Sequence, residues 1–188
     1  TASGFESFQM REMESLMGLK WIDGKLIGKP ETSNSLYDVT CDWLERTPIQ
    51  GSVYGSTSDE KNVDDFIADY LLAHKKLYPD TNKDAVNFFE EESSLRRRRA
   101  GLVFIESYRE LPLLAWPRKL ISTLIELEQS MILWRTSHAR MVERMIGRRI
   151  GTGGSSGVDY LDMTTKYRVF VDLWAVRSIL IKKEALPE

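Results

Sequence analysis

A long apolar seam within residues 118–147 constrains the fold more than any other feature of the sequence. Its members alternate spacings of four and three residues, the pattern of one helix face: Leu120, Leu124, Leu127, Met131, Trp134, His138, Met141 and Met145. The seam predicts a helix of about 28 residues, about 40 Å long at 1.5 Å per residue, with this face buried along its whole length. Such a helix needs further helices packed against it, so the seam indicates a helical bundle.

The rest of the sequence carries the same helical periodicity, with no internal repeat and no alternation typical of strands. We expect further helices over 4–17, 35–46, 59–78, from 84 onwards and over 158–181. Gly18 is expected to end the first of them. Residues 49–58 are expected to form a flexible loop and residues 147–157 a glycine-rich active-site loop. The predicted fold class is all-α, an elongated helical bundle in a single domain.

Composition excludes several classes of protein. The chain has 188 residues, of which 42% are hydrophobic, and a formal net charge of −2. This balance argues against a binder of nucleic acids or anionic membranes, because both need excess positive charge. The single cysteine, Cys41, excludes an internal disulfide framework, and no apolar run approaches the roughly 18 residues of a membrane span. We therefore expect a cytoplasmic protein without nucleic-acid or membrane partners.

His138 differs from every other member of the seam, all of which are Leu, Met or Trp. A buried imidazole needs partners for its nitrogens, so His138 either bonds to a carbonyl group in the core or ligates a cofactor. No second metal-binding side chain lies three or four residues away on this face, where the nearest carboxylate is Glu128. This argues against a zinc or di-iron site, whereas a single histidine suits haem, whose porphyrin supplies the other four nitrogens.

The segment after the predicted helix is rich in glycine. Residues 147–157 hold five of the twelve glycines of the chain, and Arg148 and Arg149 add positive charge. Such a segment is either a plain connector or an anion site built from backbone N–H groups. It matches neither a Walker A loop nor a dinucleotide fingerprint. Because it begins nine residues after His138, it suits haem propionates and the carboxylate or ammonium group of a small ligand, which Thr152 would contact.

Four consecutive arginines, Arg96–Arg99, form a second cluster of positive charge. Three glutamates, Glu90–Glu92, precede them by four to seven residues on the same predicted helical stretch. Opposite charges at this spacing pair on a helix surface. We therefore expect a solvated, ion-paired face rather than a nucleic-acid site.

Two motifs together point to a known family. Residues 133–147 read Leu-Trp-Arg-Thr-Ser-His-Ala-Arg-Met-Val-Glu-Arg-Met-Ile-Gly, and residues 151–157 read Gly-Thr-Gly-Gly-Ser-Ser-Gly. With supporting segments at 3–9, 43–48 and 167–173, the chain resembles the tryptophan 2,3-dioxygenase family over nearly its whole length. The resemblance implies an all-helical, cytosolic, tetrameric haem enzyme of the tryptophan/indoleamine dioxygenase type. Such enzymes insert O2 into the indole 2,3-bond of L-tryptophan and give N-formylkynurenine, the first step of the kynurenine pathway.

The resemblance also implies which residues form the site. His138 matches the proximal ligand of a haem b iron. The other carried-over positions are Ser3, Gly4, Gly151 and Gly153 beside the cofactor, and Thr152 at the polar end of the substrate.

The sequence departs from the family pattern in two respects. Glu6 stands where the family has Gln. The Phe-Ile-x-x-His and Tyr-x-x-x-Arg segments, which line the distal pocket and grip the substrate carboxylate, do not occur in the chain. We therefore expect the chain to be the C-terminal part of the enzyme, active when a separate N-terminal polypeptide carrying the distal pocket completes it, and assembled as a homotetramer.

Two alternatives remain open at this point. A related haem enzyme could oxygenate a modified tryptophan or another aromatic amino acid, because none of these residues defines the substituents of the indole. The chain could also be a non-catalytic haem-binding or structural helical subunit, since a fold alone does not determine a function.

Overall fold

The computed structural model describes residues 8–19, 21–22, 25–26, 35–77, 93–148 and 157–178. The chain divides into two compact units. The first unit combines Thr1–Asp38 with Thr123–Phe170, and the second combines Val39–Ser122 with Val171–Glu188. One long helix, α6, contributes residues to both units.

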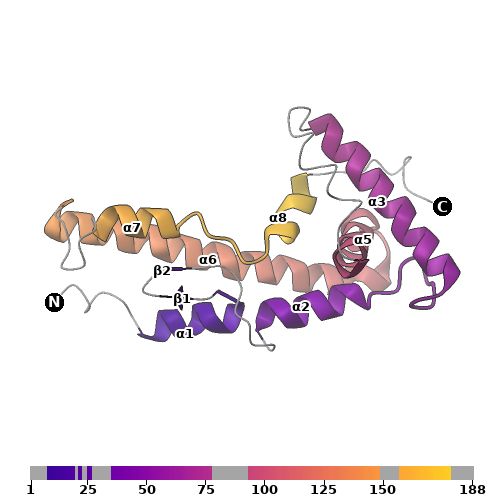
Figure 1. Ribbon diagram of the computed structural model, residues 1–188, viewed down its shortest axis with the longest axis horizontal. Helices are drawn as coiled ribbons and strands as arrows, with labels where there is room; N and C mark the ends of the chain where they lie inside the picture. The colour runs from indigo at the N-terminus through magenta and orange to yellow at the C-terminus, as the bar shows by residue number, and fades with distance from the viewer. Residues whose placement is uncertain are drawn as a thin grey trace. The chain divides into compact units, whose positions relative to one another are not determined.

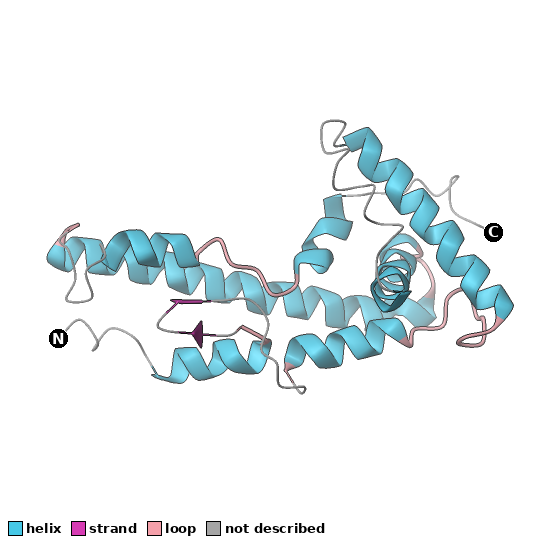
Figure 2. Cartoon of the chain, viewed as in Figure 1, coloured by secondary structure: helices cyan, strands magenta, loops and turns pink. Residues whose placement is uncertain are grey.

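Helices dominate the described part of the chain (Figure 1, Figure 2). They are α1 (Phe8–Met17), α2 (Leu36–Glu45), α3 (Thr57–Leu77), α5 (Ser93–Ser107), the short 3-10 helix η4 (Pro112–Leu114), α6 (Ala115–Ile146), α7 (Gly157–Thr164) and α8 (Val171–Ser178). The predicted all-α class is confirmed. No helix among these residues is long and apolar enough to cross a membrane.

One small β element departs from the purely helical expectation. Strands β1 (Trp21–Ile22) and β2 (Lys25–Leu26) pair antiparallel, with Trp21 opposite Leu26. Strands of two residues are too short to show an alternating pattern in the sequence. The pair lies in the segment after Gly18, which ends α1 as predicted. The φ of Gly18 is 117°, and its N–H donates to the carbonyl oxygen of Glu14 (3.1 Å).

The predicted long helix is confirmed as α6, which has 32 residues. It begins at Ala115, three residues before the predicted start. Pro117 is tolerated there, because an N–H in the first turn would have no partner inside the helix. Gly147 ends the helix with a φ of 64°, a left-handed conformation that favours glycine. Its N–H donates to the carbonyl oxygen of Glu143 (2.9 Å).

In the first unit, α1 and α7 flank the C-terminal half of α6 (Figure 1). The first half of the predicted seam is buried or half-buried, but its later members Trp134, Met141 and Met145 are exposed. The buried stripe of this unit consists instead of Leu124, Ile125, Glu128, Met131, Arg135, His138, Ala139 and Val142. The prediction of an unbroken buried seam is therefore wrong, because α1 and α7 cover the neighbouring face of the helix.

The predicted final helix over 158–181 is also wrong. The chain forms two helices, α7 and α8, joined by a turn over 165–170, and 179–181 lie outside the described residues. The hydroxyl groups of Thr164 and Thr165 donate to carbonyl oxygens in the preceding turn (2.7 Å each). Threonines that bond to the backbone in this way compete with helix continuation, so they favour an end to α7 here.

The core of the second unit forms where α3 packs on α5. The predicted helix over 59–78 is confirmed as α3, which starts two residues earlier at Thr57. Its Phe66 meets the rings of Phe104 and Tyr108 edge-on, with centroids 5.8 and 6.0 Å away. The same unit also buries several aliphatic side chains fully: Ile49, Ile67, Leu102 and Ile105.

The arginine run of α5 binds carboxylates on other elements of the second unit. The pairs are Arg96–Asp64, Arg97–Asp59 and Arg99–Asp172. Arg97 and Arg99 are largely buried, so the expectation of a solvated face is wrong for these two side chains. The expected partners Glu90–Glu92 lie outside the described residues. The run therefore serves tertiary packing.

Candidate functional site

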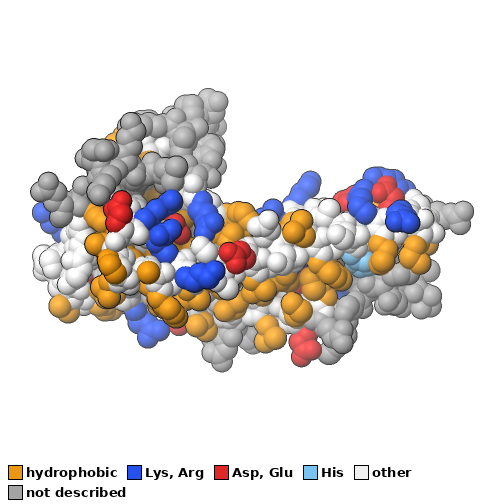
Figure 3. Space-filling view, turned by 180° about the vertical axis from the view of Figure 1, so that it is seen from behind, with side chains coloured by type: hydrophobic (Ala, Val, Ile, Leu, Met, Phe, Trp, Pro, Cys, Tyr) orange, Lys and Arg blue, Asp and Glu red, His pale blue; other side chains and the backbone are white. Residues whose placement is uncertain are grey.

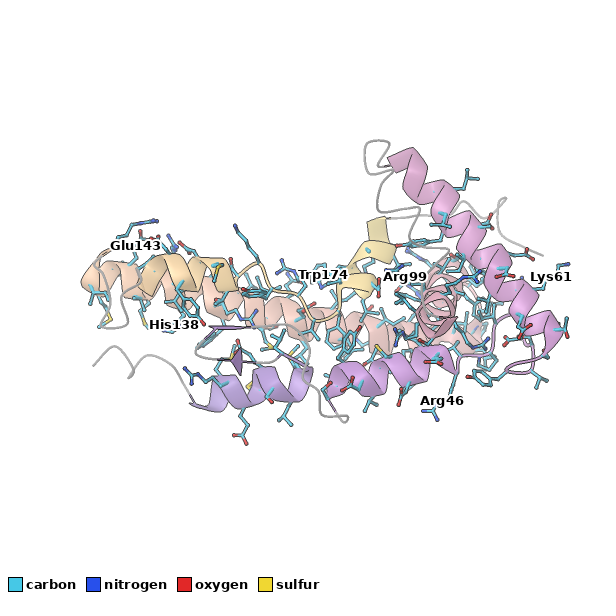
Figure 4. The ribbon with its side chains drawn as sticks, viewed as in Figure 1. Arg46, Lys61, Arg99, His138, Glu143 and Trp174 are labelled. Carbon is cyan, nitrogen blue, oxygen red and sulfur yellow. The ribbon has the colours of Figure 1, made fainter. Side chains whose placement is uncertain are left out.

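His138 projects from α6 on the side away from Glu143 (Figure 4). Its side chain is buried, with 7% of the residue exposed. Its ring lies against the indole of Trp134, four residues earlier on the same helix face, with ring centroids 4.9 Å apart and planes inclined by 44°. Among the described residues, the imidazole has no hydrogen-bond partner. Within the described part of the chain, no protein group therefore occupies a nitrogen of this ring.

Burial lowers the pKa of His138 below its ordinary value of 6.5. The cause is desolvation, which penalises the imidazolium cation. His138 is therefore neutral at physiological pH, and a neutral imidazole is the form that ligates a metal.

An exposed apolar surface adjoins this histidine. Trp134, Met141 and Met145 are 42%, 46% and 62% exposed, and Figure 3 shows hydrophobic side chains beside the pale-blue histidine. A hollow of about 550 Å³ on the same helix is lined by Thr136, Ser137, Arg140, Met141, Arg144 and Met145. A neutral imidazole at the edge of an exposed apolar surface suits haem, because the porphyrin is largely apolar and leaves one axial position to the protein.

Arg148 belongs to an ionic network at the junction of α6 and α7. Its Nε donates to Oε1 of Glu143 and its Nη1 to Oδ1 of Asp159, both at 3.0 Å. Glu143 also accepts a hydrogen bond from Nη1 of Arg140 (2.6 Å), whose Nη2 pairs with Asp162. The positive charge that Arg148 was expected to add to the glycine-rich segment is thus shared with the carboxylates of Glu143 and Asp159.

Six further residues singled out from the sequence lie outside the described residues: Ser3, Gly4, Arg149, Gly151, Thr152 and Gly153. The roles that the family resemblance gives them stay predictions. Among the described helices, α1 begins at Phe8, four residues after Gly4. Helix α7 begins at Gly157, the last residue of the predicted loop over 147–157.

The sequence analysis named Glu128 only as the nearest carboxylate and did not predict that Glu128 and Arg135 are buried beside His138. Arg135 lies one turn before His138, and Glu128 lies two turns before Arg135, so all three share one side of the helix. Opposite charges seven residues apart beside a buried histidine were the available signal. The spacing of the apolar residues instead predicted burial of the adjacent face of the helix.

The second unit contains a separate hollow of about 790 Å³. Its apolar lining includes Trp43, Phe104, Tyr108, Leu111, Leu114 and Pro117. Gln50 adds polarity, since its Nε2 donates to the hydroxyl oxygen of Tyr108 (3.2 Å). His138, the one predicted site residue within the described part of the chain, does not line this hollow.

Known proteins resemble the chain along its whole length. The family model for tryptophan 2,3-dioxygenase matches residues 1–180. A tryptophan 2,3-dioxygenase-like protein of Xanthomonas campestris pv. campestris (strain 8004) is 37% identical over 100% of this chain and 89% of its own length. Tryptophan 2,3-dioxygenase 2 of Ralstonia nicotianae and tryptophan 2,3-dioxygenase of Sorangium cellulosum are each 39% identical. These two matches cover 99% and 100% of this chain but 65% and 59% of the relatives.

The chain thus spans less than two thirds of the length of the Ralstonia and Sorangium relatives. Its match to the family model nevertheless extends across both units and includes the helix that carries His138. Together with the placement of that histidine beside an apolar surface, this match establishes that the chain belongs to the tryptophan 2,3-dioxygenase family.

Proposed function

We propose that the chain is part of a haem-dependent oxygenase that inserts O2 into the indole 2,3-bond of L-tryptophan and gives N-formylkynurenine. Membership of the tryptophan 2,3-dioxygenase family and the names of the relatives support an enzyme that oxygenates tryptophan. The structural observation that carries the proposal is His138, a buried neutral imidazole without a hydrogen-bond partner among the described residues, beside an exposed apolar surface.

The described residues would hold the cofactor and exclude water from it. Haem b, when bound, supplies the iron at which O2 reacts. The imidazole of His138 would ligate that iron, and the indole of Trp134 would restrict rotation of the imidazole. Trp134, Met141 and Met145 would be covered by the cofactor. Covering them favours binding, because each Å² of apolar surface removed from water is worth about 25 cal/mol.

Residues outside the described part complete the proposed site. Gly151 and Gly153 would allow backbone N–H groups to approach the cofactor's anionic edge. The hydroxyl of Thr152 would contact the polar end of tryptophan, and Ser3 and Gly4 would line the distal pocket. A wrong ligand that left such a buried polar group unpaired would lose about 1–3 kcal/mol, which would make the site selective for an amino acid.

The proposal includes a second polypeptide that carries the rest of the distal pocket, and a homotetramer of the completed protomer in the cytoplasm. Intact mass spectrometry of the purified protein tests for the second polypeptide. Light scattering of the same sample tests the number of subunits. A single polypeptide that turns over tryptophan by itself would contradict the need for a partner.

Haem titration tests the proposed ligand without requiring activity. The chain has two histidines, so His74→Ala is a matched control for His138→Ala. We expect a Soret band typical of histidine-ligated haem in the wild type and in His74→Ala. His138→Ala should lose that band, and added imidazole should restore it. Unchanged haem affinity and an unchanged spectrum in His138→Ala would refute the assignment of the ligand.

Product analysis tests the reaction. The purified complex is incubated with haem, L-tryptophan and ¹⁸O-labelled O2, and the product is analysed by mass spectrometry. Insertion into the 2,3-bond incorporates both oxygen atoms of one O2 molecule. A product with one labelled oxygen, or no product from a haem-loaded complex, would refute the proposed dioxygenase reaction.

A further inference from the structure

Two charged side chains, Glu128 and Arg135, are buried in α6, with 3% and 4% exposed. A buried charge is costly unless it is paired and hydrogen-bonded. The proposed function uses neither residue. Both share the buried stripe with His138, so their contacts bear on how the helix that carries the proposed iron ligand is held.

The guanidinium of Arg135 joins three segments of the first unit. Its Nε and Nη2 donate to Oε1 of Glu14 in α1, at 3.0 and 2.7 Å. Its Nη1 donates to the carbonyl oxygen of Thr164, the last residue of α7, at 3.3 Å, and to that of Tyr167 at 3.5 Å. One side chain therefore pairs with a buried carboxylate of α1 and binds the carbonyl oxygen at the end of α7, which also accepts a hydrogen bond from the backbone N–H of Tyr167 (3.3 Å).

Glu128 binds the C-terminal end of the 165–170 turn, which joins α7 to α8. Its Oε1 accepts a hydrogen bond from the backbone N–H of Val169 and another, at 3.4 Å, from that of Phe170. The ends of the 165–170 turn are thus bound by two side chains of α6 that lie two helical turns apart. A rotation of α6 about its axis would break these buried hydrogen bonds.

Rotation of α6 matters because His138 lies close to Arg135 around the helix. Residues three apart are separated by about 60° around the axis. Imidazole nitrogens stand roughly 6 Å from the axis, so a rotation of about 20° would move them by about 2 Å. A displacement of about 1 Å at a reacting centre can cost about 100-fold in rate.

We propose that Arg135 is a positioning residue for His138. Bound to Glu14 and to the end of α7, Arg135 sets the rotation of α6 and thereby the direction in which the imidazole points. The effect on iron ligation rests on the proposed function, whereas the orientation of the imidazole is measurable without haem.

The haem-free test uses NMR of labelled histidines. The chain has two histidines, so two Cε1–H signals are expected, and His74→Gln assigns them. The signal of His138 reports orientation, because the ring current of Trp134 acts on it at a centroid distance of 4.9 Å. Arg135→Lys keeps the charge but loses the planar fork that makes these hydrogen bonds, and we expect it to shift the His138 signal.

Arg97→Lys is the matched control for stability, because Arg97 forms a largely buried ion pair with Asp59 in the second unit. We expect it to leave the His138 signal in place. Glu14→Gln weakens the contact between Glu14 and Arg135 more mildly, since it keeps the shape of the acceptor and removes its charge. It should shift the His138 signal in the same direction as Arg135→Lys, and it serves if Arg135→Lys does not fold.

The haem-loaded test uses the same variants well below their unfolding temperatures. We expect Arg135→Lys to bind haem at least tenfold more weakly and to shift the iron–histidine stretching frequency in the resonance Raman spectrum. Arg97→Lys should change neither quantity, even where its loss of thermal stability is as large. A purely structural role of Arg135 would instead make the two variants alike.

The outcomes separate this inference from the proposed function. An unchanged His138 signal in folded Arg135→Lys and Glu14→Gln overturns the inference, whether or not the wild type binds haem. A shifted signal together with a wild type that binds no haem supports the positioning of His138 and refutes the proposed function.

Discussion

Replacement of Gly101 by alanine should destabilise the chain, although the same exchange inside a helix normally stabilises it by about 0.8–1 kcal/mol. Gly101 lies in α5, buried against the end of α2. A Cβ atom at this position would lie 2.8 Å from the carbonyl oxygen of Leu44 and 3.4 Å from Cβ of Thr47. The oxygen is a backbone atom, so it cannot rotate away as the end of a side chain could.

The expected loss follows from two opposing contributions. Overpacking a tight contact costs about 1–3 kcal/mol. The gain in helix propensity offsets part of this, so we expect a net loss of about 1–2 kcal/mol. For a chain of this size, each kcal/mol corresponds to about 2–4 °C in Tm, which predicts a fall of about 2–8 °C.

Urea and thermal unfolding followed by circular dichroism measure this loss. Gly157→Ala is the matched control, because no atom of the described residues lies within 4 Å of its Cβ position. We expect that variant to be as stable as the wild type or slightly more stable. A Gly101→Ala variant at least as stable as the wild type would refute the argument that close approach of α5 and the end of α2 requires glycine.

Three further perturbations test other contacts. Glu128→Ala should cost about 2–4 kcal/mol, because it leaves two buried backbone N–H groups without a partner, whereas Glu128→Gln keeps an oxygen acceptor and should cost less. Equal losses in urea unfolding would contradict this. Burial raises the pKa of Tyr160 to about 12, so its contribution to stability should fall as pH rises above 10, the ordinary value. From about pH 9 to about pH 11, the free energy of unfolding should therefore fall less in Tyr160→Phe than in the wild type. Urea unfolding at these two pH values measures the difference. Burial alone would raise the pKa of Asp59, but hydrogen bonds from Arg97, Ser52 and Gly55 outweigh it and lower that pKa below 3.8. The stabilisation by ionised Asp59 is therefore present above pH 3.8 and lost as pH falls through the lowered pKa. The free energy of unfolding of Asp59→Asn should thus lie below that of the wild type at neutral pH, and the two values should converge in acid.

The local spacing of apolar residues and the position of glycine were sufficient to predict most of the helices. The apolar spacing in 59–78 and 118–147 corresponds to α3 and α6, and Gly18 ends α1 as expected. These features depend on residues within a few positions of one another, since helix hydrogen bonds and glycine stops are local interactions.

The break between α7 and α8 could not be predicted in the same way. The sequence pattern continues across 165–170, but Glu128 and Arg135 of α6 bind the backbone groups that a continuous helix would pair internally. These partners lie 29 and 41 residues away in the chain. A local pattern contains no information about them.

For the candidate site as well, the sequence predicted some features and tertiary packing decided others. The family motif singled out His138, and the structure buries it as expected. The motif did not reveal that Trp134 and Met141 would be exposed, or that Arg148 would pair with Glu143.

The amino-acid sequence alone determined that this chain forms long helices, and it singled out one histidine among apolar neighbours, because both follow from residue type and spacing. Tertiary structure decided which face of α6 is buried, where the last helices separate and which charges lie inside. The physical reason is that burial and ion pairing each require a second surface, and the position of that surface depends on how α1, α6 and α7 pack together.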